Sequence, residues 1–287
     1  MELAVKDFIN YLKNKQGSQN TIVSYERDIN QFVKYLDSTN KKIFDAEEQD
    51  VIEYMTKLQN KGQKNSTISR KIASIKALYR YLCLHKMVES NIADNVEVPK
   101  VEKPEPSILS VSEIEKLLEQ PDTDDLKGQR DKAMLEVLYA TGMRVTELVS
   151  LSVDDVNLNT GIIKVAKKTK ERSIPLSNSA IKSLKTYISN VRPLLIKTEE
   201  EKILFINANG QKMTRQGFWK ILKQYKSQAK IEKELNPHVI RHSFAVHKLQ
   251  QGVELKEVQE ILGHTDIAST QIYMHMAGLD SNHNVEL

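Results

Sequence analysis

A proline-rich stretch near residue 100 separates two sets of helical patterns. Three of the seven prolines lie within the sequence NIADNVEVPKVEKPEPSIL. Proline has no amide proton and a fixed φ, so a stretch of this kind with mixed charge is extended rather than helical. A chain of 287 residues is long enough to bury two cores of ordinary size. We therefore expect an N-terminal domain at 1–90 and a C-terminal domain at 108–287, joined by a linker at 91–107.

The N-terminal residues carry apolar side chains at helical spacing. Two long stripes run over 22–36 and 68–82, and shorter ones over 8–12 and 51–58. Apolar residues three or four positions apart form one face of a helix, and that face must be buried against another element. Four such helices are enough for a small bundle. The expected N-terminal domain is therefore a four-helix bundle.

The C-terminal residues are also mainly helical, with one clear β pattern. Ser110 and Glu113 have capping-box spacing, and helical patterns follow at 130–139 and beyond residue 178. Between them, GIIKVA and RSIPL flank the lysine-rich KKTKE, a pattern typical of a β-hairpin. We expect a mostly helical domain with a small antiparallel sheet, and hence a mainly α protein of two domains.

The net charge of +4 is unevenly distributed. Residues 161–240 contain 17 Lys and Arg against 6 Asp and Glu, a net of +11, and the rest of the chain contains 25 against 32, a net of −7. The predicted helix at 68–82 adds Arg70, Lys76 and Arg80 among its apolar positions. Such surfaces are either solvated lysine-rich faces or contacts for phosphates. The charge pattern favours a nucleic acid as partner without settling the choice.

The composition excludes several classes of protein. Hydrophobic residues make up 40% and charged residues 28%, as in an ordinary globular protein. No apolar run is long enough to span a membrane, and the N-terminal sequence lacks a signal-peptide pattern. A single cysteine, Cys83, rules out an internal disulfide and a thiolate metal cluster. We expect a cytoplasmic protein with no membrane association.

The sequence NPHVIRHSFA places two histidines and an arginine on one helix face. Pro237 suits the first turn of a helix, and His238, Arg241 and His242 follow at spacings of three and four. A helix N-terminus with such residues favours anions, although an ordinary surface helix explains this motif alone equally well. The histidines also have zinc-ligand spacing. However, apolar residues stand where a zinc protease carries its glutamate, and Arg241 would repel a cation, so we expect no metal.

Two further motifs add an arginine, a histidine and a tyrosine. In LYATGMRVTELVSL, Arg144 comes two residues after Gly142, a glycine that can bend the backbone so that the arginine points into a site. In EILGHTDIASTQIYMH, His264 lies at a helix junction and Tyr273 follows nine residues later. A tyrosine at this helical spacing is by itself more often a core residue than a nucleophile.

Together these motifs and the hairpin lysine supply cations and a phenol but no acid. The set is Arg144, Lys168, His238, Arg241, His264 and Tyr273. Sugar hydrolysis needs a pair of carboxylates, and a metal nuclease needs clustered acids for its ions. Cations instead suit a phosphodiester, whose transition state gathers negative charge on the non-bridging oxygens.

Nearly the whole chain resembles the tyrosine recombinases, and within them the Xer-type site-specific recombinases of bacteria and archaea. The signature boxes of that family are similar to RDKAMLEVLYATGMRVTELVSL, HVIRHSFAVHKLQQG and LGHTDIASTQIYMH. Its core-binding, SAM-like domain is similar to TIVSYERDINQFVKYL and STISRKIASIKALYRYL. The resemblance implies two domains that close around duplex DNA and act without a cofactor.

By resemblance, the residues of this set take roles in DNA cleavage. Arg144 and Arg241 match the arginines that clamp the scissile phosphate, and His264 matches a third phosphate ligand. His238 matches the histidine that accepts the tyrosine proton, and Tyr273 matches the nucleophile that forms a 3′-phosphotyrosyl link. The freed 5′-hydroxyl of a partner strand then reverses the attack.

Other matching positions are supporting residues and DNA contacts. Glu147 matches an acid that orients the first arginine. His242 is expected to support the catalytic residues without contacting the DNA itself. The general acid for the leaving 5′-hydroxyl falls at Lys168 or Lys167, because AKKTKER lacks the glycines of the family's hairpin and is one residue shorter; we prefer Lys168. The candidates for DNA contacts are Arg70, Lys76, Arg80, Lys167, Lys170, Arg172 and Arg215.

The resemblance also implies an assembly and a biological role. Four subunits, identical or of two kinds, would act on two DNA sites, with a second Xer recombinase and a DNA translocase as further partners. The expected role is resolution of chromosome or plasmid dimers. The alternatives are movement of a mobile element, DNA relaxation as by a type IB topoisomerase, and regulation by a DNA-binding protein without activity. The complete core-binding domain favours recombination, and the complete set of six residues argues against an inactive regulator.

Overall fold

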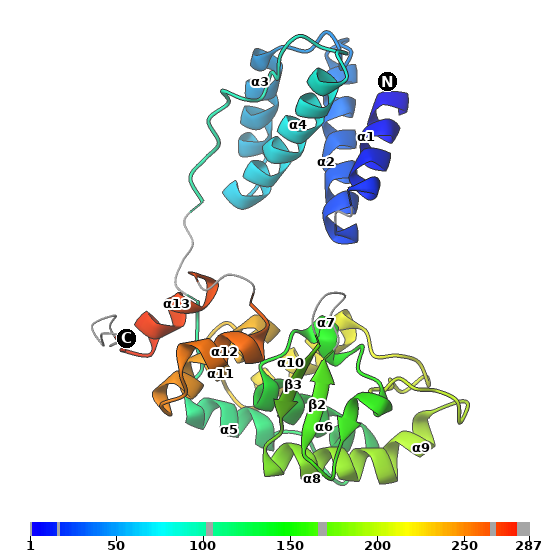
Figure 1. Ribbon diagram of the computed structural model, residues 1–287, viewed down its shortest axis with the longest axis vertical. Coiled ribbons are helices and arrows are strands. Elements are labelled where there is room, and N and C mark those ends of the chain that lie inside the picture. Colours follow the sequence, from blue (N-terminus) through cyan, green and yellow to red (C-terminus); the bar gives the residue numbers. More distant parts are fainter. Residues whose placement is uncertain (1, 16–17, 102–105, 166–170, 265–267, 280–287) are drawn as a thin grey trace. The chain divides into compact units, whose positions relative to one another are not determined.

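The structure is a computed structural model that describes residues 2–15, 18–101, 106–165, 171–264 and 268–279 (Figure 1). The chain forms two compact units, Met1–Pro104 and Glu105–Leu287, which we call the N-terminal and C-terminal units. Each unit has its own hydrophobic core. The fold is mainly helical, as the sequence predicts.

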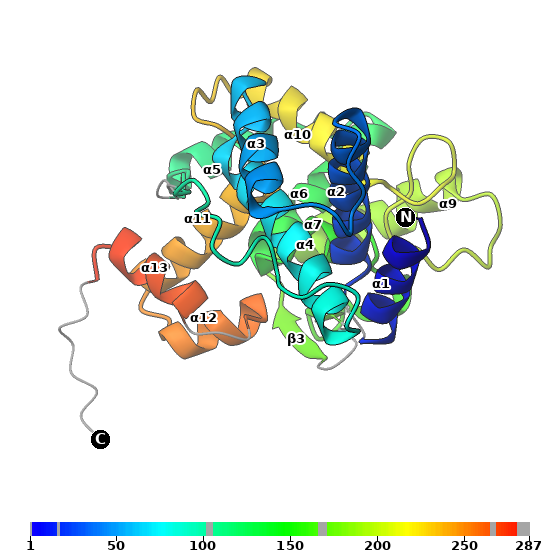
Figure 2. The same cartoon turned by 90° about the horizontal axis from the view of Figure 1, so that it is seen from above.

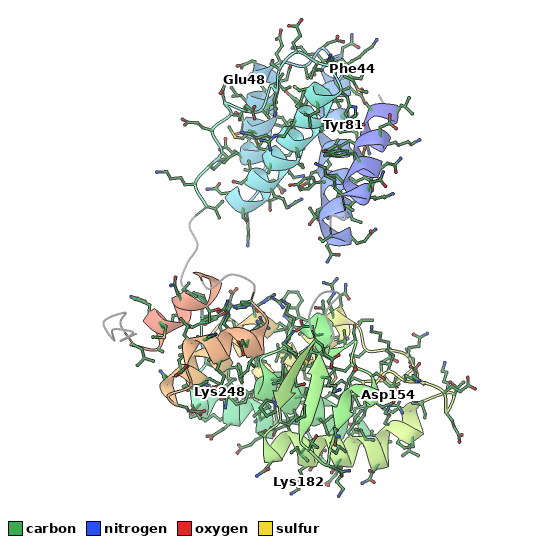
Figure 3. All side chains as sticks on the ribbon, viewed as in Figure 1. Phe44, Glu48, Tyr81, Asp154, Lys182 and Lys248 are labelled. Carbon is green, nitrogen blue, oxygen red and sulfur yellow. The ribbon has the colours of Figure 1, made fainter. Side chains whose placement is uncertain are left out.

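Four helices build the N-terminal unit. They are α1 (Glu2–Asn14), α2 (Gln19–Ser38), α3 (Glu48–Asn60) and α4 (Asn65–Leu84). Phe32 and Tyr79 are fully buried between them. Tyr81 also points inward, with its ring 5.5 Å from that of Phe8, whereas Phe44 is 45% exposed (Figure 3). The predicted four-helix bundle is confirmed, because each helix buries the apolar face that its sequence spacing creates.

The residues that follow α4 pack on the N-terminal unit. Ala93 is fully buried in its core. The side-chain amide of Asn65 donates to the Lys100 carbonyl at 3.2 Å. The carbonyl oxygens of an extended segment are free to accept hydrogen bonds. Side chains of α4 can therefore bind this segment although it forms no β-sheet. Residues 91–101, which we expected to be part of the linker, therefore lie on the first unit.

The C-terminal unit is built around α6, which is buried on most sides. Its helices are α5 (Val111–Glu119), α6 (Leu126–Thr141), α7 (Val145–Leu148), α8 (Asn178–Thr186), α9 (Arg192–Leu195), α10 (Arg215–Gln228), α11 (Pro237–Gln250), α12 (Leu255–Leu262) and α13 (Ala268–Met276), with a 3-10 turn at Val153–Asp155 and a π-helical turn at Tyr187–Val191. Met134, Leu135 and Leu138 of α6 belong to the core. Helices α11, α12 and α13 lie side by side (Figures 1 and 2).

A small antiparallel sheet covers part of this core. Its strands are β1 (Val156–Asn157), β2 (Ile162–Val165) and β3 (Arg172–Pro175), in the order β1-β2-β3. Ile163 of β2 pairs with Ile174 of β3, and both side chains are buried. Residues at alternate positions of a strand share a face, so this pair fixes which face meets the core. The predicted hairpin is confirmed, although its turn at 166–170 lies outside the described residues.

Gly142 ends α6 and redirects the chain at Arg144. Its φ is +57°, in the left-handed region, and its amide donates to the Leu138 carbonyl at 2.9 Å. A Cβ at this position would lie 2.4 Å from Cδ1 of Phe244 on α11 and 3.0 Å from Cδ2 of Leu262. Arg144 then caps α7 instead of continuing α6. The predicted bend is confirmed. Glycine suits this position because it tolerates the positive φ and has no Cβ that would clash with Phe244.

We predict that Gly142→Ala destabilises the C-terminal unit by about 2–5 kcal/mol. The left-handed backbone accounts for roughly 1–2 kcal/mol and the clash with Phe244 for about 1–3 kcal/mol more. Gly252→Ala is the matched control, because Gly252 has a φ of +85° but no atom within 4 Å of the added Cβ. Gly252→Ala should lose only the roughly 1–2 kcal/mol that comes from the left-handed backbone. Urea unfolding measures both, and equal losses would show that the approach of Phe244 is unimportant.

Candidate active site

Helix α11 presents His238, Arg241 and His242 from its first two turns. The Asn236 side-chain oxygen caps the helix by accepting from the amides of His238 at 2.8 Å and Val239 at 3.2 Å. Pro237 occupies the first helical position, where its missing amide proton costs nothing. The predicted helix start is confirmed, and the cap fixes the direction in which the three side chains leave the helix.

Arg241 is the buried centre of the site, with only 4% of its surface exposed. Its Nη1 donates to the Gly142 carbonyl at 2.7 Å, and its Nη2 donates to the Leu262 carbonyl at 2.8 Å. These carbonyls lie at the C-terminal ends of α6 and α12, where helix oxygens lack backbone partners and carry partial negative charge. Burial, and then the charge of Arg144, lower the pKa of Arg241 to about 10, so it stays charged near neutral pH.

His264 is held between Arg241 and α13. Its Nε2 lies 2.8 Å from Nη2 of Arg241, and its Nδ1 lies 2.9 Å from the Thr270 hydroxyl. An arginine can only donate, so Nε2 is the acceptor and the ring proton sits on Nδ1, which donates to Thr270. We did not predict Thr270. No sequence signal marks it, because its role follows from where α13 packs.

Arg144 and Glu147 form the second part of the site. The Arg144 amide donates to Oε2 of Glu147 at 2.8 Å, and Nη1 of Arg144 lies 3.5 Å from Oε1. The side chain of Arg144 is 37% exposed, so a ligand can reach its guanidinium from the surface. Glu147 thus contacts both the backbone and the guanidinium of Arg144, and its role in orienting that arginine stays a prediction.

Arg172 lies inside the protein, which differs from its expected contact with DNA. Its side chain is 9% exposed. Its Nη2 donates to Glu147 at 2.8 Å, and its Nε donates to the Ile261 carbonyl at 2.8 Å. These bonds tie β3 to α7 and α12. Arg172 therefore donates its hydrogen bonds within the protein. The carboxylate of Glu147 is the counter-charge of two arginines, Arg172 and Arg144.

Tyr273 projects from α13 into the site and is 3% exposed. Its hydroxyl lies 2.7 Å from Nδ1 of His242, and the two rings are 5.5 Å apart. Burial raises the pKa of Tyr273 above 10.0, while Arg241 and Arg144 oppose the rise. His238 is exposed, and its ring lies 6.4 Å from that of His242. The structure thus places His242, rather than His238, at the phenol.

Two of the candidate DNA contacts of the N-terminal unit take part in ion pairs within the protein. Arg70 meets the fully buried Asp28, which also lies 3.4 Å from Nζ of Lys71. Lys76 lies 3.2 Å from Asp94. The Arg70 pair joins α4 to α2, because a carboxylate without a cation would be costly at a fully buried position.

The other basic candidates are exposed or lie outside the described residues. Arg80 on α4 and Arg215 at the start of α10 are exposed. Lys167, Lys168 and Lys170 belong to the turn between β2 and β3, outside the described residues. The choice between Lys168 and Lys167 therefore remains a prediction from the sequence.

The described residues offer no metal site. Within them, no group of three His, Cys, Asp or Glu side chains could hold an ion. His238 and His242, which have zinc-ligand spacing, thus lack a third protein ligand in this part of the chain. None of the helices described is long and apolar enough to cross a membrane.

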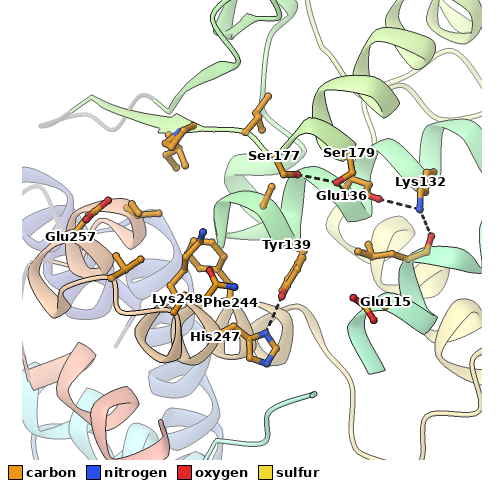
Figure 4. A pocket seen from close by; sticks show the side chains of 18 of the residues that line it. Glu115, Lys132, Glu136, Tyr139, Ser177, Ser179, Phe244, His247, Lys248 and Glu257 are labelled. Carbon is orange, nitrogen blue, oxygen red and sulfur yellow. Dashed lines mark hydrogen bonds and ion pairs between the residues drawn. The ribbon is translucent and has the colours of Figure 1, made fainter. Parts of the chain in front are cut away.

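A cavity of about 590 Å³ opens on another face of α11 (Figure 4). Phe244, His247 and Lys248 line it together with Tyr139, whose hydroxyl lies 2.9 Å from Nδ1 of His247. None of the predicted catalytic residues that the structure describes lines this cavity. The predicted site is instead reached from the surface through Arg144.

Two family models together match most of the chain. The Phage integrase family matches residues 107–278, and the Phage integrase, N-terminal SAM-like domain matches residues 5–86. The chain belongs to the phage integrase family. Both matches agree with the two compact units of the fold.

Similar proteins carry the name Tyrosine recombinase XerD. The protein from Staphylococcus epidermidis is 41% identical over 280 residues, which are 96% of this chain and 95% of that protein. The protein from Listeria monocytogenes is 42% identical over 281 residues, with 96% and 94% covered. The chain is therefore a site-specific recombinase of the tyrosine type, which cuts and rejoins DNA. The activity predicted from the resemblance is confirmed.

Solved recombinase structures share the fold. XerH site-specific recombinase bound to palindromic difH substrate has a TM-score of 0.75 at 23% identity, covering 89% of this chain and 76% of that chain. The Tn1549 transposon integrase in complex with circular intermediate DNA has a TM-score of 0.76 at 20% identity, covering 94% of each chain. The mainly helical fold with its small sheet is thus that of the tyrosine recombinases.

We predict that Glu147→Gln weakens the C-terminal unit in a pH-dependent way. Burial raises the pKa of Glu147, but hydrogen bonds from Arg172 and from the Arg144 amide outweigh burial and hold the folded pKa below 4.5. The charge therefore stabilises the fold above about pH 4.5, and this contribution is lost as the pH falls through the depressed folded value.

At pH 7 the variant should be less stable than the wild type by on the order of 1–3 kcal/mol, because Arg172 loses its buried counter-charge. The difference should narrow at pH 3.5, below the unfolded pKa of 4.5. Urea unfolding at the two pH values measures it. A difference that is the same at both would mean that the charge of Glu147 does not stabilise the fold.

Proposed function

We propose that this recombinase acts on duplex DNA through Tyr273, which attacks the scissile phosphate and becomes linked to the 3′ end. The observation that carries the proposal is the position of the phenol within the cationic cluster, where Arg241 and Arg144 oppose the rise of its pKa. A phenol beside guanidinium groups is placed to attack an anionic phosphodiester whose charge those groups offset. The names of the XerD relatives and the solved complexes with DNA support DNA as the substrate.

Arg144 and Arg241 clamp the scissile phosphate. Of its five N–H groups, Arg241 uses three in the described bonds, to Gly142, Leu262 and His264. The group at Nε and the second one at Nη1 take part in none of these bonds and remain available as donors to the phosphate. Arg144 adds a guanidinium that is partly exposed. Negative charge grows on these oxygens as phosphorus becomes five-coordinate, so both arginines lower the barrier.

His264 joins the phosphate after a change of partner. Its Nε2 accepts a bond from Arg241 in the described arrangement and so carries no proton. A phosphate that draws Arg241 away from Nε2 adds negative charge, which favours uptake of a proton from solvent at Nε2. The ring then donates to the phosphate from Nε2 while Nδ1 keeps its bond to Thr270.

Two residues move protons during cleavage. The phenolic oxygen of Tyr273 forms a bond to phosphorus, and His238 accepts its proton. The bond from phosphorus to the 5′ oxygen breaks, and Lys168 gives this oxygen a proton. The covalent link conserves the energy of the phosphodiester, so neither a nucleotide nor a metal is needed. Attack by the 5′-hydroxyl of a partner strand reverses each step and completes the exchange.

The biological role that we propose is resolution of chromosome or plasmid dimers. The relatives named XerD are 41–42% identical over nearly the full length, whereas the transposon integrase shares only the fold at 20% identity. Four subunits would act on two sites in the cytoplasm, with a second recombinase and a DNA translocase as partners. A plasmid with two sites separates this role from that of a topoisomerase, because recombination changes its sequence order and relaxation does not.

We predict that Tyr273→Phe binds the DNA site but never becomes attached to it. The substitution removes one oxygen from a buried ring, so the fold and the many phosphate contacts remain. A nicked suicide substrate followed by denaturing gel electrophoresis tests this. A protein–DNA band from the variant would show that another residue is the nucleophile.

We predict that Arg144→Lys and Arg241→Lys lose rate and keep most of their DNA affinity. A lysine is a point charge and cannot replace a planar clamp on two oxygens. Losing such a donor typically lowers the rate about 100- to 1,000-fold, whereas binding spread over many phosphates changes by on the order of 1 kcal/mol.

A binding titration and a single-turnover cleavage rate, on the same duplex at the same salt, separate the two effects. Arg215→Lys is the control for an exposed arginine outside the cluster, and it should keep its rate. If a variant lost affinity while its cleavage rate at saturating protein stayed normal, that arginine would serve in binding alone.

A further inference from the structure

The Tyr273 hydroxyl has one described hydrogen-bond partner, Nδ1 of His242, at 2.7 Å. The residue is 3% exposed, so a hydroxyl proton that pointed elsewhere would be buried without a partner. The phenol is therefore the donor and the imidazole nitrogen is the acceptor. This bond fixes the direction in which the phenolic proton points.

His242 is a poor base for this proton. Burial, and then the charges of His238 and Arg241, lower the pKa of His242 to about 4. The pKa of Tyr273 is raised above 10.0. Transfer of the proton from Tyr273 to His242 is thus disfavoured, since the donor pKa is raised and the acceptor pKa is lowered. The bond keeps the proton on the phenol and does not prepare the oxygen for attack.

Apolar packing also holds the Tyr273 end of α13, and the Tyr273 ring lies 6.4 Å from that of His264. Its apolar neighbours form a small cluster with α11 and α12, separate from the main core of the unit, that includes Phe244, Val258 and Leu262. A further polar contact of this helix runs from Thr270 to His264 at 2.9 Å. This packing holds the ring, whereas the bond to His242 is the described contact that fixes the hydroxyl group.

We infer that His242 is a positioning residue that restrains the Tyr273 phenol in a resting orientation, and that this restraint must break before Tyr273 can attack. The inference rests on the proposed role of Tyr273 as nucleophile and adds what holds that nucleophile back. His238, the proposed proton acceptor, is exposed, with its ring 6.4 Å from that of His242. The phenol must leave His242 to pass its proton to His238.

Two substitutions separate the restraint from the packing of the ring. His242→Phe keeps a ring of similar size but has no acceptor, so the phenol is released. His242→Asn places an amide oxygen near the position of Nδ1 and should restore the restraint. Thermal unfolding of both variants checks that α11 remains folded.

The first measurement needs no DNA. Tetranitromethane nitrates accessible tyrosines, and peptide mass spectrometry follows Tyr273 alone, with the fully buried Tyr187 as internal reference. We expect Tyr273 to be nitrated about fivefold faster in His242→Phe than in the wild type, and near the wild-type rate in His242→Asn. Fivefold corresponds to a hydrogen bond worth about 1 kcal/mol. Nitration of Tyr273 at the wild-type rate in His242→Phe would overturn the inference.

The second measurement is single-turnover cleavage of a suicide substrate at saturating protein. We expect His242→Phe to cleave about fivefold faster than the wild type, with an unchanged half-saturating protein concentration, and His242→Asn to return toward the wild-type rate. Slower cleavage by His242→Phe would overturn the inference, because His242 would then assist the reaction.

Failure of the proposed function has a different signature. If His242→Phe combined with Tyr273→Phe still formed a covalent link, Tyr273 would not be the nucleophile. The nitration result would stand in that case, because it reports only on the hydrogen bond. The two claims are thus tested by different observations.

Discussion

The buried guanidinium of Arg241 is the interaction on which the rest of the site depends. Removing a charge from water is costly, and here the carbonyls of Gly142 and Leu262 offset that cost at 2.7 and 2.8 Å. Both carbonyls belong to helix ends, so the cation joins α6, α11 and α12 at one point. Gly142 must be a glycine there, because a Cβ would meet Phe244 at 2.4 Å. The packing of these helices and the position of the guanidinium therefore depend on each other.

Glu147 makes this concentration of positive charge possible. It accepts bonds from Arg172 and from the Arg144 amide, and it lies 3.5 Å from the Arg144 guanidinium. One carboxylate thus faces two arginines. Arg241 is also close, since the charge of Arg144 lowers its pKa and the charge of Glu147 raises it. The cluster keeps a net positive charge, which suits a phosphodiester and would repel a metal ion.

The histidines of the cluster are bonded within the protein rather than arranged for reaction. His264 accepts from Arg241, and His242 accepts from Tyr273. Both bonds leave the acceptor nitrogens without protons, whereas phosphate binding calls for donors. In the proposed mechanism, a substrate therefore exchanges these internal bonds for its own.

Much of the fold could be predicted from the sequence because it depends on neighbours along the chain. Apolar spacing predicts the four-helix bundle, Pro237 predicts the start of α11, and the flanking strands predict the hairpin. The order of the motifs also leads to the family. The packing of residues 91–101 on the first unit was missed, since buried Ala93 looks like any linker residue in the sequence.

The motifs reveal which chemical groups the site contains, because they carry the arginines, histidines and tyrosine in fixed order. The contacts of each group, in contrast, follow from the tertiary structure. Arg241 reaches a carbonyl 99 residues away, and Arg172 reaches one 89 residues away and so becomes a buried tie. The tertiary structure also places His242, 31 residues from Tyr273, at the phenol. Such partners depend on which helices pack together, and neither apolar spacing nor a helix cap tells which helix meets which.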